Sequence, residues 1–134
     1  MKTISVFIGA AMMSSSALAC ECAADSVENG MRESTYVFGA AVIRVAVERD
    51  GLGIKIANVA NLKGEFKGGQ LKTSSSRSGC GLTMRIPEKY VFFVDKDGFF
   101  SSCGATRIFG DADLGVLNDQ VLNQWIDRAR KASQ

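Results

Sequence analysis

The sequence predicts a mainly β domain, a small closed or nearly closed barrel with one helix packed against it. Short apolar segments recur between residues 36 and 103, several with two-residue alternation, and turn-forming residues separate them. Beyond residue 113 the apolar spacing changes to three and four residues, which is typical of an amphipathic helix. About 115 residues would remain after removal of an expected leader, which is the length of one domain.

Residues 36–47 predict a long first strand, which follows an irregular or weakly helical lead-in over residues 23–34. Gly39 is expected to mark a bend or bulge in this strand. The pair Asp50-Gly51 then signals a turn.

The apolar alternation of residues 53–62 shifts phase near Asn58, which predicts a second strand with a bulge at that point. A glycine-rich break follows over residues 64–69. Residues 70–73 predict a short third strand.

Residues 89–94 form an apolar strand, and the turn Asp95-Lys96-Asp97-Gly98 leads into residues 99–103, so the two pieces predict a hairpin. The carboxylates of this turn are interpreted as turn residues rather than catalytic or calcium-binding groups, because a calcium loop needs more oxygen ligands. The aromatic residues of the hairpin are expected in the core rather than on a base-stacking platform: Phe92, Phe93, Phe99 and Phe100.

Apolar residues recur from Leu114 to Ala129 at helical spacing, with acidic residues near the start and basic residues at the end, as the helix dipole favours. Trp125 is expected to pack on the sheet. Five strands and one late helix in a single small domain fit the five-stranded OB-fold best among small barrels.

Residues 1–19 have the three parts of a cleaved secretory signal. Lys2 gives the positive start, an apolar stretch follows, and Ala17-Leu18-Ala19 provides small residues for a leader peptidase. The mature chain is therefore expected to be one domain, residues 20–134, secreted or periplasmic. Lipid modification of Cys20 is the alternative that would attach it to a membrane, although Ala17 stands where that pattern has leucine.

Composition excludes several function classes. Without Lys2 the formal charge falls from +2 to +1, which argues against a nucleic acid or an anionic membrane surface as the partner. The chain has no histidine, which removes the commonest acid/base group and any Ser-His or Cys-His nucleophile pair. We therefore expect no enzyme activity and no cofactor, and the oligomeric state is left open.

All four cysteines lie beyond the expected signal, and an even number in a small exported chain predicts two disulfides. A bridge between Cys20 and Cys22 would close a very tight ring. The two are therefore expected to pair with Cys80 and Cys103, in one order or the other. A zinc site of four thiolates is the alternative, but only one close pair of cysteines is present.

An ordered set of motifs extends over nearly all of residues 20–134. It resembles the netrin-like module, and is nearest to the amino-terminal domain of the tissue inhibitors of metalloproteinases. The motifs are Cys20-x-Cys22, the strand Ala40-Ala41-Val42-Ile43-Arg44-Val45, Leu62-Lys63-Gly64, Cys80-Gly81, Gly98 through Ser102-Cys103, and the terminal helix.

This resemblance implies an OB-fold barrel with bridges Cys20–Cys80 and Cys22–Cys103. It also implies that the amine and carbonyl of Cys20 chelate the zinc ion of a target metalloprotease, while Glu21 points into the specificity pocket. The inhibitory ridge would comprise Glu21, Cys22, Ala23, Ser76, Arg77, Ser78 and Gly79. The chain departs from the family in lacking the cysteines of its third disulfide, and in having Glu21 where a small or hydroxylic residue is usual.

The chemistry of a free Cys20 amine suits this role, because an α-amine has an ordinary pKa of about 8 and zinc would displace its proton further. Amine and carbonyl of one residue close a five-membered chelate ring, so the inhibitor needs no histidine and no metal of its own. The alternative hypothesis is an exported protein-interaction module that uses the barrel face or the loop at residues 74–79 and contacts no metal.

Overall fold

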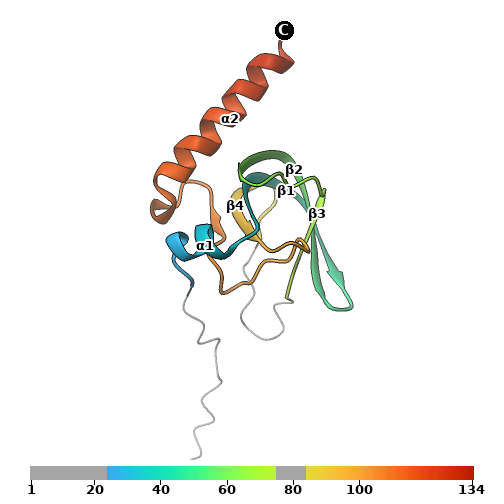
Figure 1. Ribbon diagram of the computed structural model, residues 1–134. Coiled ribbons are helices and arrows are strands. Elements are labelled where there is room, and N and C mark those ends of the chain that lie inside the picture. Colours follow the sequence, from blue (N-terminus) through green and yellow to red (C-terminus); the bar gives the residue numbers. More distant parts are fainter. Residues whose placement is uncertain (1–23, 75–83) are drawn as a thin grey trace, which may run out of the picture.

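The computed structural model describes residues 24–74 and 84–134. Its framework is a five-stranded antiparallel sheet in the order β3-β2-β1-β4-β5, accompanied by a C-terminal helix, α2 (Figure 1). The prediction of a mainly β chain with five strands and a late helix is confirmed. The sheet is open, and a closed barrel is not seen among the described strands.

Strands β1 (Tyr36–Glu48) and β2 (Gly51–Lys63) form the longest ladder, with 13 residues each. The pairing moves from Gly39 with Ala60 to Ala41 with Ala57, so β2 contains one extra residue at this point. Asn58 lies in the gap with a φ of 56°, a conformation that asparagine tolerates better than most residues. The predicted bulge near Asn58 is confirmed.

Strand β3 (Gln70–Thr73) pairs with β2, and β4 (Lys89–Val94) pairs with β1, both antiparallel and both within the predicted bounds. The antiparallel partner of β4 on its other side is β5 (Arg107–Ile108), so the hairpin predicted with residues 99–103 is wrong. The predicted turn does form, because the side chain of Asp95 accepts hydrogen bonds from the backbone amides of Asp97 and Phe99.

The segment after this turn uses its backbone groups elsewhere. The amide of Lys72 in β3 donates to the carbonyl of Gly98 at 3.0 Å, and the amide of Phe100 donates to the carbonyl of Lys72 at 3.0 Å. Lys72 and Phe99 thus form an isolated parallel bridge between the β3 edge and the chain that follows β4. These bonds, made to a strand distant in sequence, explain why residues 99–103 do not fold back along β4.

Alternating side chains of the sheet enter two separate apolar clusters. The inner core lies on one face and consists of Phe38, Ala40, Val42, Ile54, Ile56, Leu71, Tyr90, Phe92, Val94 and Phe100. The outer core lies on the other face, against the helices, and consists of Val37, Ala60, Val91, Phe93, Ala105, Leu114 and Val121. Of the four phenylalanines expected in the core, Phe99 is the exception, with 39% of its surface exposed.

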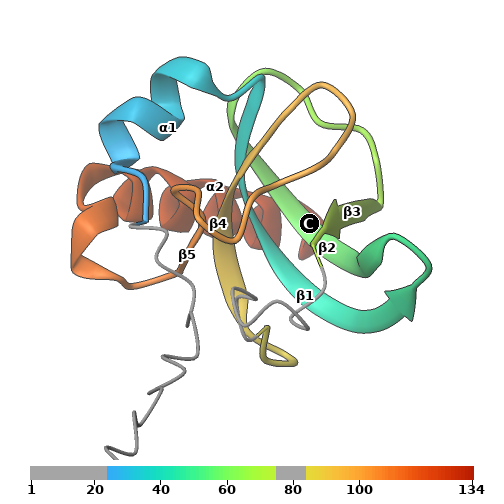
Figure 2. The ribbon, with the colours of Figure 1, turned by 90° about the horizontal axis from the view of Figure 1, so that it is seen from below.

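Helices α1 (Val27–Glu33) and α2 (Val116–Ala132) both contribute to the outer core and lie on the same side of the sheet (Figure 2). A short 3-10 helix, η2 (Ala112–Leu114), precedes α2. Val121 is fully buried and Trp125 packs against the same cluster, as the helical spacing predicts. The indole Nε1 of Trp125 donates to the carbonyl of Asn58 at 2.8 Å, which fixes α2 to the bulge of β2.

No helix in residues 24–74 or 84–134 combines the length and apolar character that crossing a membrane requires.

Candidate functional site

The residues predicted to carry function lie largely outside the described part of the chain. This applies to Cys20, Glu21, Cys22 and Ala23, to the ridge segment Ser76, Arg77, Ser78 and Gly79, and to Cys80. Cys103 is described and is a disulfide-bonded cysteine. The partners of Cys103 in both predicted pairings, and the other three thiolates of the alternative zinc site, lie outside the described residues.

The flanking residues meet at one cavity, called here the Arg107 cavity. It has a volume of about 470 Å³, and its wall includes Ala24, Arg85, Tyr90, Ser102, Gly104 and Arg107. Ala24 is the first described residue, Arg85 is the second residue after the undescribed loop, and Ser102 and Gly104 flank Cys103. Three segments distant in sequence thus converge here.

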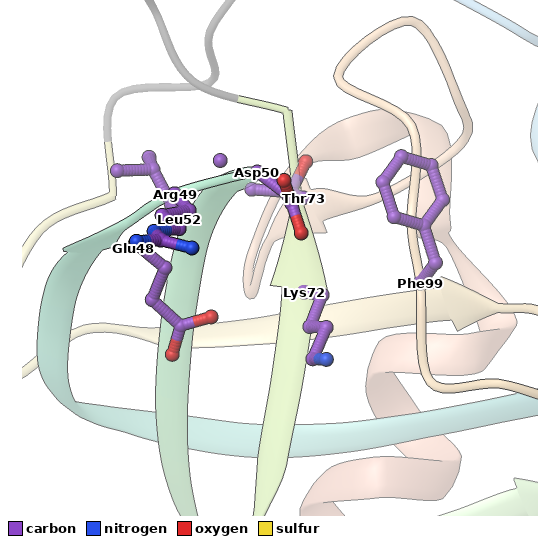
Figure 3. Close-up of a pocket in the computed structure, with 8 residues that line it drawn as sticks. Glu48, Arg49, Asp50, Leu52, Lys72, Thr73 and Phe99 are labelled. Carbon is purple, nitrogen blue, oxygen red and sulfur yellow. The ribbon is translucent and has the colours of Figure 1, made fainter.

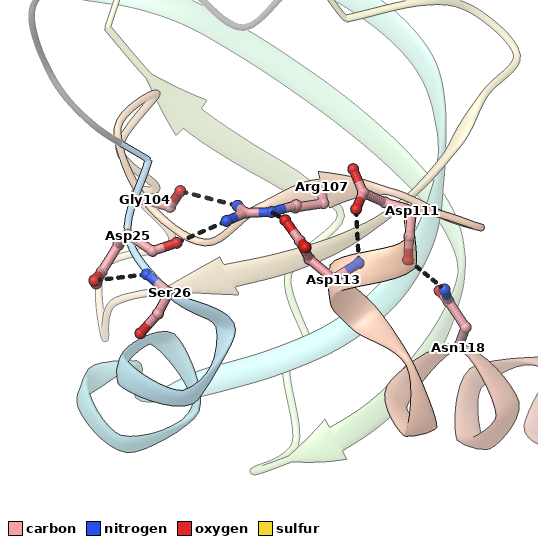
Figure 4. Close-up of polar contacts among 7 residues, drawn as sticks. All are labelled: Asp25, Ser26, Gly104, Arg107, Asp111, Asp113 and Asn118. Atoms are coloured by element: carbon pink, nitrogen blue, oxygen red, sulfur yellow. Dashed lines mark hydrogen bonds and ion pairs between the residues drawn. The ribbon is translucent and has the colours of Figure 1, made fainter.

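The guanidinium of Arg107 connects these segments (Figure 4). It donates from Nη2 to the carbonyl of Asp25 at 2.7 Å and from Nη1 to the carbonyl of Gly104 at 3.4 Å, and its Nε lies 3.3 Å from Oδ2 of Asp113. Hydrogen bonds to a charged group contribute about 1.5–3 kcal/mol each when they are short and shielded.

The contacts of Arg107 contribute unequally to stability because their partners differ in solvent exposure. The side chain of Arg107 is 13% exposed, whereas that of Asp113 is 70% exposed. An ion pair with one partner in water is worth about 0–1 kcal/mol. The short bond to the carbonyl of Asp25 therefore contributes most, and the main effect of Arg107 is to hold the chain at Asp25.

Asp25 is fixed from three directions. Its amide donates to the carbonyl of Cys103 at 2.9 Å, its carbonyl accepts from Arg107, and its Oδ1 accepts from the amide of Ser26 and from Nδ2 of Asn29. The side chain of Ser26 caps α1 by accepting from the amide of Asn29 at 3.1 Å. The start of the described chain is thereby held against the backbone of Cys103.

The turn before α2 positions Asp113. Oδ1 of Asp111 accepts from the amide of Asp113 at 2.9 Å, and Nδ2 of Asn118 donates to the carbonyl of Asp111 at 3.0 Å (Figure 4). Because Asn118 belongs to α2, the helix is connected to the same polar network as Arg107.

Described residues on either side of positions 75–83 also bond to this region. Before these positions, the hydroxyl of Thr73 donates to the carbonyl of Phe100 at 2.7 Å, and Thr73 is buried. After them, the amide of Arg85 donates to the hydroxyl of Tyr90 at 2.9 Å. Phe100 lies three positions before Cys103, and Tyr90 lines the Arg107 cavity.

A second cavity, of about 420 Å³, lies at the tip of the β1–β2 hairpin (Figure 3). Glu48, Arg49, Asp50, Lys72 and Phe99 are among its lining residues. Its charges are mixed, and Oε1 of Glu48 is already bonded to Nε2 of Gln70 at 2.9 Å. This cavity adjoins the β3 edge at Lys72 and Thr73.

Within the two described ranges, no three His, Cys, Asp or Glu side chains come together to hold a metal ion. The lining of the Arg107 cavity includes two guanidinium groups, two carboxylates and a buried tyrosine, which belong to Arg85, Arg107, Asp111, Asp113 and Tyr90. The bonds of Arg107 to the carbonyls of Asp25 and Gly104 hold the two chain segments in position.

Sequence reasoning missed Arg107 and Thr106. Oγ1 of Thr106 is buried and accepts from the amide of Phe93 at 3.1 Å, which sets β5 beside β4 and so places Arg107. Neither residue belongs to a recognisable motif. The main partner of Arg107 is a backbone carbonyl 82 positions away, and side-chain patterns carry no signal for such a contact.

No protein-family model, curated protein or solved structure matches this chain.

Proposed function

We propose that residues 20–134 act as an exported inhibitor of zinc metalloproteases, in which the amine and carbonyl of Cys20 chelate the target's zinc ion. The observation that carries this proposal is the position of Asp25, held between the carbonyl of Cys103 and the guanidinium of Arg107. An inhibitor that acts through its first residue needs its leading segment fixed, because otherwise binding must supply the entropy cost of ordering it.

Chain length supports the proposed bridge between Cys22 and Cys103. Asp25 is three positions after Cys22, and a chain of three residues spans at most about 10 Å. Because the amide of Asp25 lies 2.9 Å from the carbonyl of Cys103, Cys22 is within reach of Cys103. The bridge from Cys20 to Cys80 would then join the leading segment to the loop.

The attachments of the loop support the proposed ridge. Thr73 and Arg85 tie the two ends of residues 75–83 to Phe100 and Tyr90. Arg85, the second described residue after position 83, lines the same cavity as Ala24, the first described residue. This is the neighbourhood that the ridge of Glu21 to Ala23 and Ser76 to Gly79 requires.

We also propose that the sheet belongs to an OB-fold-like barrel. The parallel contact of Lys72 with Phe99 supports this, because it joins the β3 edge of the sheet to the chain that follows β4. The resulting arrangement resembles the partly open five-stranded barrel of that fold.

The proposal is tested with two forms of the purified protein, one that begins at Cys20 and one with a single alanine ahead of it. The extra residue removes the free amine from the chelating position but leaves both bridges possible. The first form should inhibit zinc endopeptidases from a secreted panel, and the second should not. Equal inhibition by two folded forms, or a natural mature chain that begins elsewhere or has a blocked amine, would sink the proposal.

A second variant tests the position of Asp25. Arg107→Gln removes the guanidinium while Cys20 is unchanged, so inhibition should weaken although the amine is free. Lys67→Gln is the matched control, since the side chain of Lys67 is 80% exposed and its ion pair, at 4.0 Å, is with Glu65, which is 73% exposed. Equal loss in both variants would show that net charge, rather than a fixed leading segment, governs inhibition.

A second candidate function is an exported protein-interaction module that contacts no metal. The exposed half of α2 favours it, because Leu122 and Ile126 are 44% and 40% exposed one helical turn apart. This candidate has no inhibitory activity, so absence of inhibition by the folded form that begins at Cys20, or a natural mature chain with a blocked amine or another first residue, would favour it over the first.

A further inference from the structure

The two ends of α2 differ in what surrounds them. The start of the helix joins the Arg107 network through Asn118, and its middle packs on the sheet through Val121 and Trp125. Every residue from Ile126 to the end of the chain is exposed, and the helix extends beyond the sheet (Figure 1). A pocket lies where the last turns of α2 leave the sheet.

This pocket has a volume of about 340 Å³ and is called here the Trp125 pocket. Its lining residues are Asn58, Lys89, Trp125, Arg128, Ala129 and Ala132. They come from the bulge of β2, the start of β4 and the last two turns of α2. Arg128 lies twelve residues after Val116, the first residue of α2. At a rise of about 1.5 Å per residue, the pocket is about 18 Å along the helix from its start. It is thus separate from the Arg107 cavity.

One wall of the pocket is rigid. The indole of Trp125 is held by its hydrogen bond to the carbonyl of Asn58 at 2.8 Å. It also packs edge-on against the ring of Phe109, with 4.9 Å between the ring centroids. Nζ of Lys89 lies 4.4 Å from the centroid of the indole, a cation–π contact. An aromatic ring held on several sides is a fixed surface for a ligand.

The charge of the pocket is of one sign. Lys89 and Arg128 both line it, and no acidic residue does. The ion pairs in the described part of the chain, Lys67 with Glu65 and Arg107 with Asp113, involve neither of them. The helix dipole places about half a negative charge at the C-terminal end of α2. The two positive charges of Lys89 and Arg128 exceed it. An anionic group placed here would meet uncompensated positive charge.

We infer that the Trp125 pocket binds a carboxylate carried on an apolar body, such as the last residue of a peptide with a hydrophobic side chain. The guanidinium of Arg128 matches a carboxylate with paired donors, and the ammonium of Lys89 supplies the second positive charge. The indole, Ala129 and Ala132 would cover the apolar body. A small inorganic anion would leave that apolar wall uncovered.

The test is a titration of the purified protein with N-acetyl-L-phenylalanine, followed by tryptophan fluorescence. Trp125 is the only tryptophan of the chain, so the signal reports on the pocket directly. We expect a saturable change, and at least tenfold weaker binding of N-acetyl-L-phenylalanine amide, which has the same body without the charge. Equal affinity for acid and amide, or no saturable change, overturns the inference.

Two variants and one further anion separate the pocket from general charge effects. The double variant Lys89→Gln/Arg128→Gln should bind the acid at least tenfold more weakly. The matched double variant Lys55→Gln/Arg130→Gln removes the same charges from exposed positions outside the pocket and should stay within twofold of the original. An equal loss in the control overturns the inference, as does a saturable change of the same size with inorganic phosphate. Neither double variant touches Cys20, so this test can fail while metalloprotease inhibition is retained.

Discussion

The inner and outer cores are filled in opposite ways, although they lie on two faces of the same strands. The inner core is built around large rings. Phe92 lies 5.7, 5.8 and 5.3 Å, centroid to centroid, from Phe38, Tyr90 and Phe100, and Phe66 stacks on Phe38 at 4.7 Å. The outer core is built around close approach, since helices α1 and α2 reach the sheet where side chains are missing.

Two glycines show this close approach. A Cβ built at Gly39 of β1 would meet both methyl groups of Val121, with Cγ2 at 3.0 Å. It would also lie 3.2 Å from Cζ2 of Trp125. A Cβ at Gly30 of α1 would collide with Ala105 and with the ring of Phe93. The free energy of unfolding should therefore fall most when side-chain atoms are removed from the inner core. In the outer core it should fall most when atoms are added.

The largest effect is expected from Phe92→Ala in the inner core. Phe92 is fully buried, and the change leaves a cavity among three other rings, which costs about 3–5 kcal/mol of unfolding free energy. Urea denaturation followed by circular dichroism measures this cost. Should Phe92→Ala unfold the protein outright, Phe92→Leu, with a smaller cavity, keeps the comparison measurable. A loss below 1 kcal/mol for Phe92→Ala would contradict the account of the inner core.

A smaller effect, about 1–3 kcal/mol, is expected from Gly39→Ala in the outer core. The added methyl group must push Val121 and α2 away from β1. Gly69→Ala is the matched control, because nothing lies within 4 Å of a Cβ built there. The stability of both variants is measured in the same urea titration.

A double-mutant cycle identifies the cause. Val121→Ala removes both methyl groups that a Cβ at Gly39 would meet, so Gly39→Ala should cost less in that background, with a coupling of about 0.5–3 kcal/mol. Independent, additive costs would show that Gly39 is required for a reason other than the approach of α2.

The comparison also explains how much of the fold the sequence could predict. Strands that alternate between the two cores show their period in the sequence, so β1, β2, β3 and β4 were all predictable. The bulge at Asn58 was predictable because it shifts that period. Gly39 was expected to mark a bend or bulge, and the register does shift beside it, between Gly39 and Ala41, with the extra residue on β2. What the sequence did not indicate is that Gly39 makes room for Val121, a contact with a helix about 80 positions away.

The partner of β4 was not predictable for a similar reason. The turn at Asp95 is a local feature and was predictable. The strand that lies beside β4 depends instead on bonds between distant segments. The backbone of Lys72 bonds to that of residues 98–100, and the hydroxyl of Thr106 accepts from the amide of Phe93, which positions β5.

The candidate site also depends on contacts between distant segments. Cys20 and the ridge were proposed from motifs and stay predictions, while Arg107 acts through backbone carbonyls, which no motif encodes.

The smallest effect is expected from Ser26→Ala, which tests whether α1 can loosen without disturbing the inner core. The variant removes the cap that the hydroxyl of Ser26 provides to the amide of Asn29, at a cost of about 1 kcal/mol. Hydrogen exchange should quicken at the amides of α1 and leave those of β3 unchanged, because α1 contributes side chains to the outer core only and β3 contributes Leu71 to the inner core only. Ser26→Asp retains a capping oxygen and should exchange like the original protein. Equal quickening in α1 and β3 would show that the two cores open together and that the division between them has no dynamic meaning.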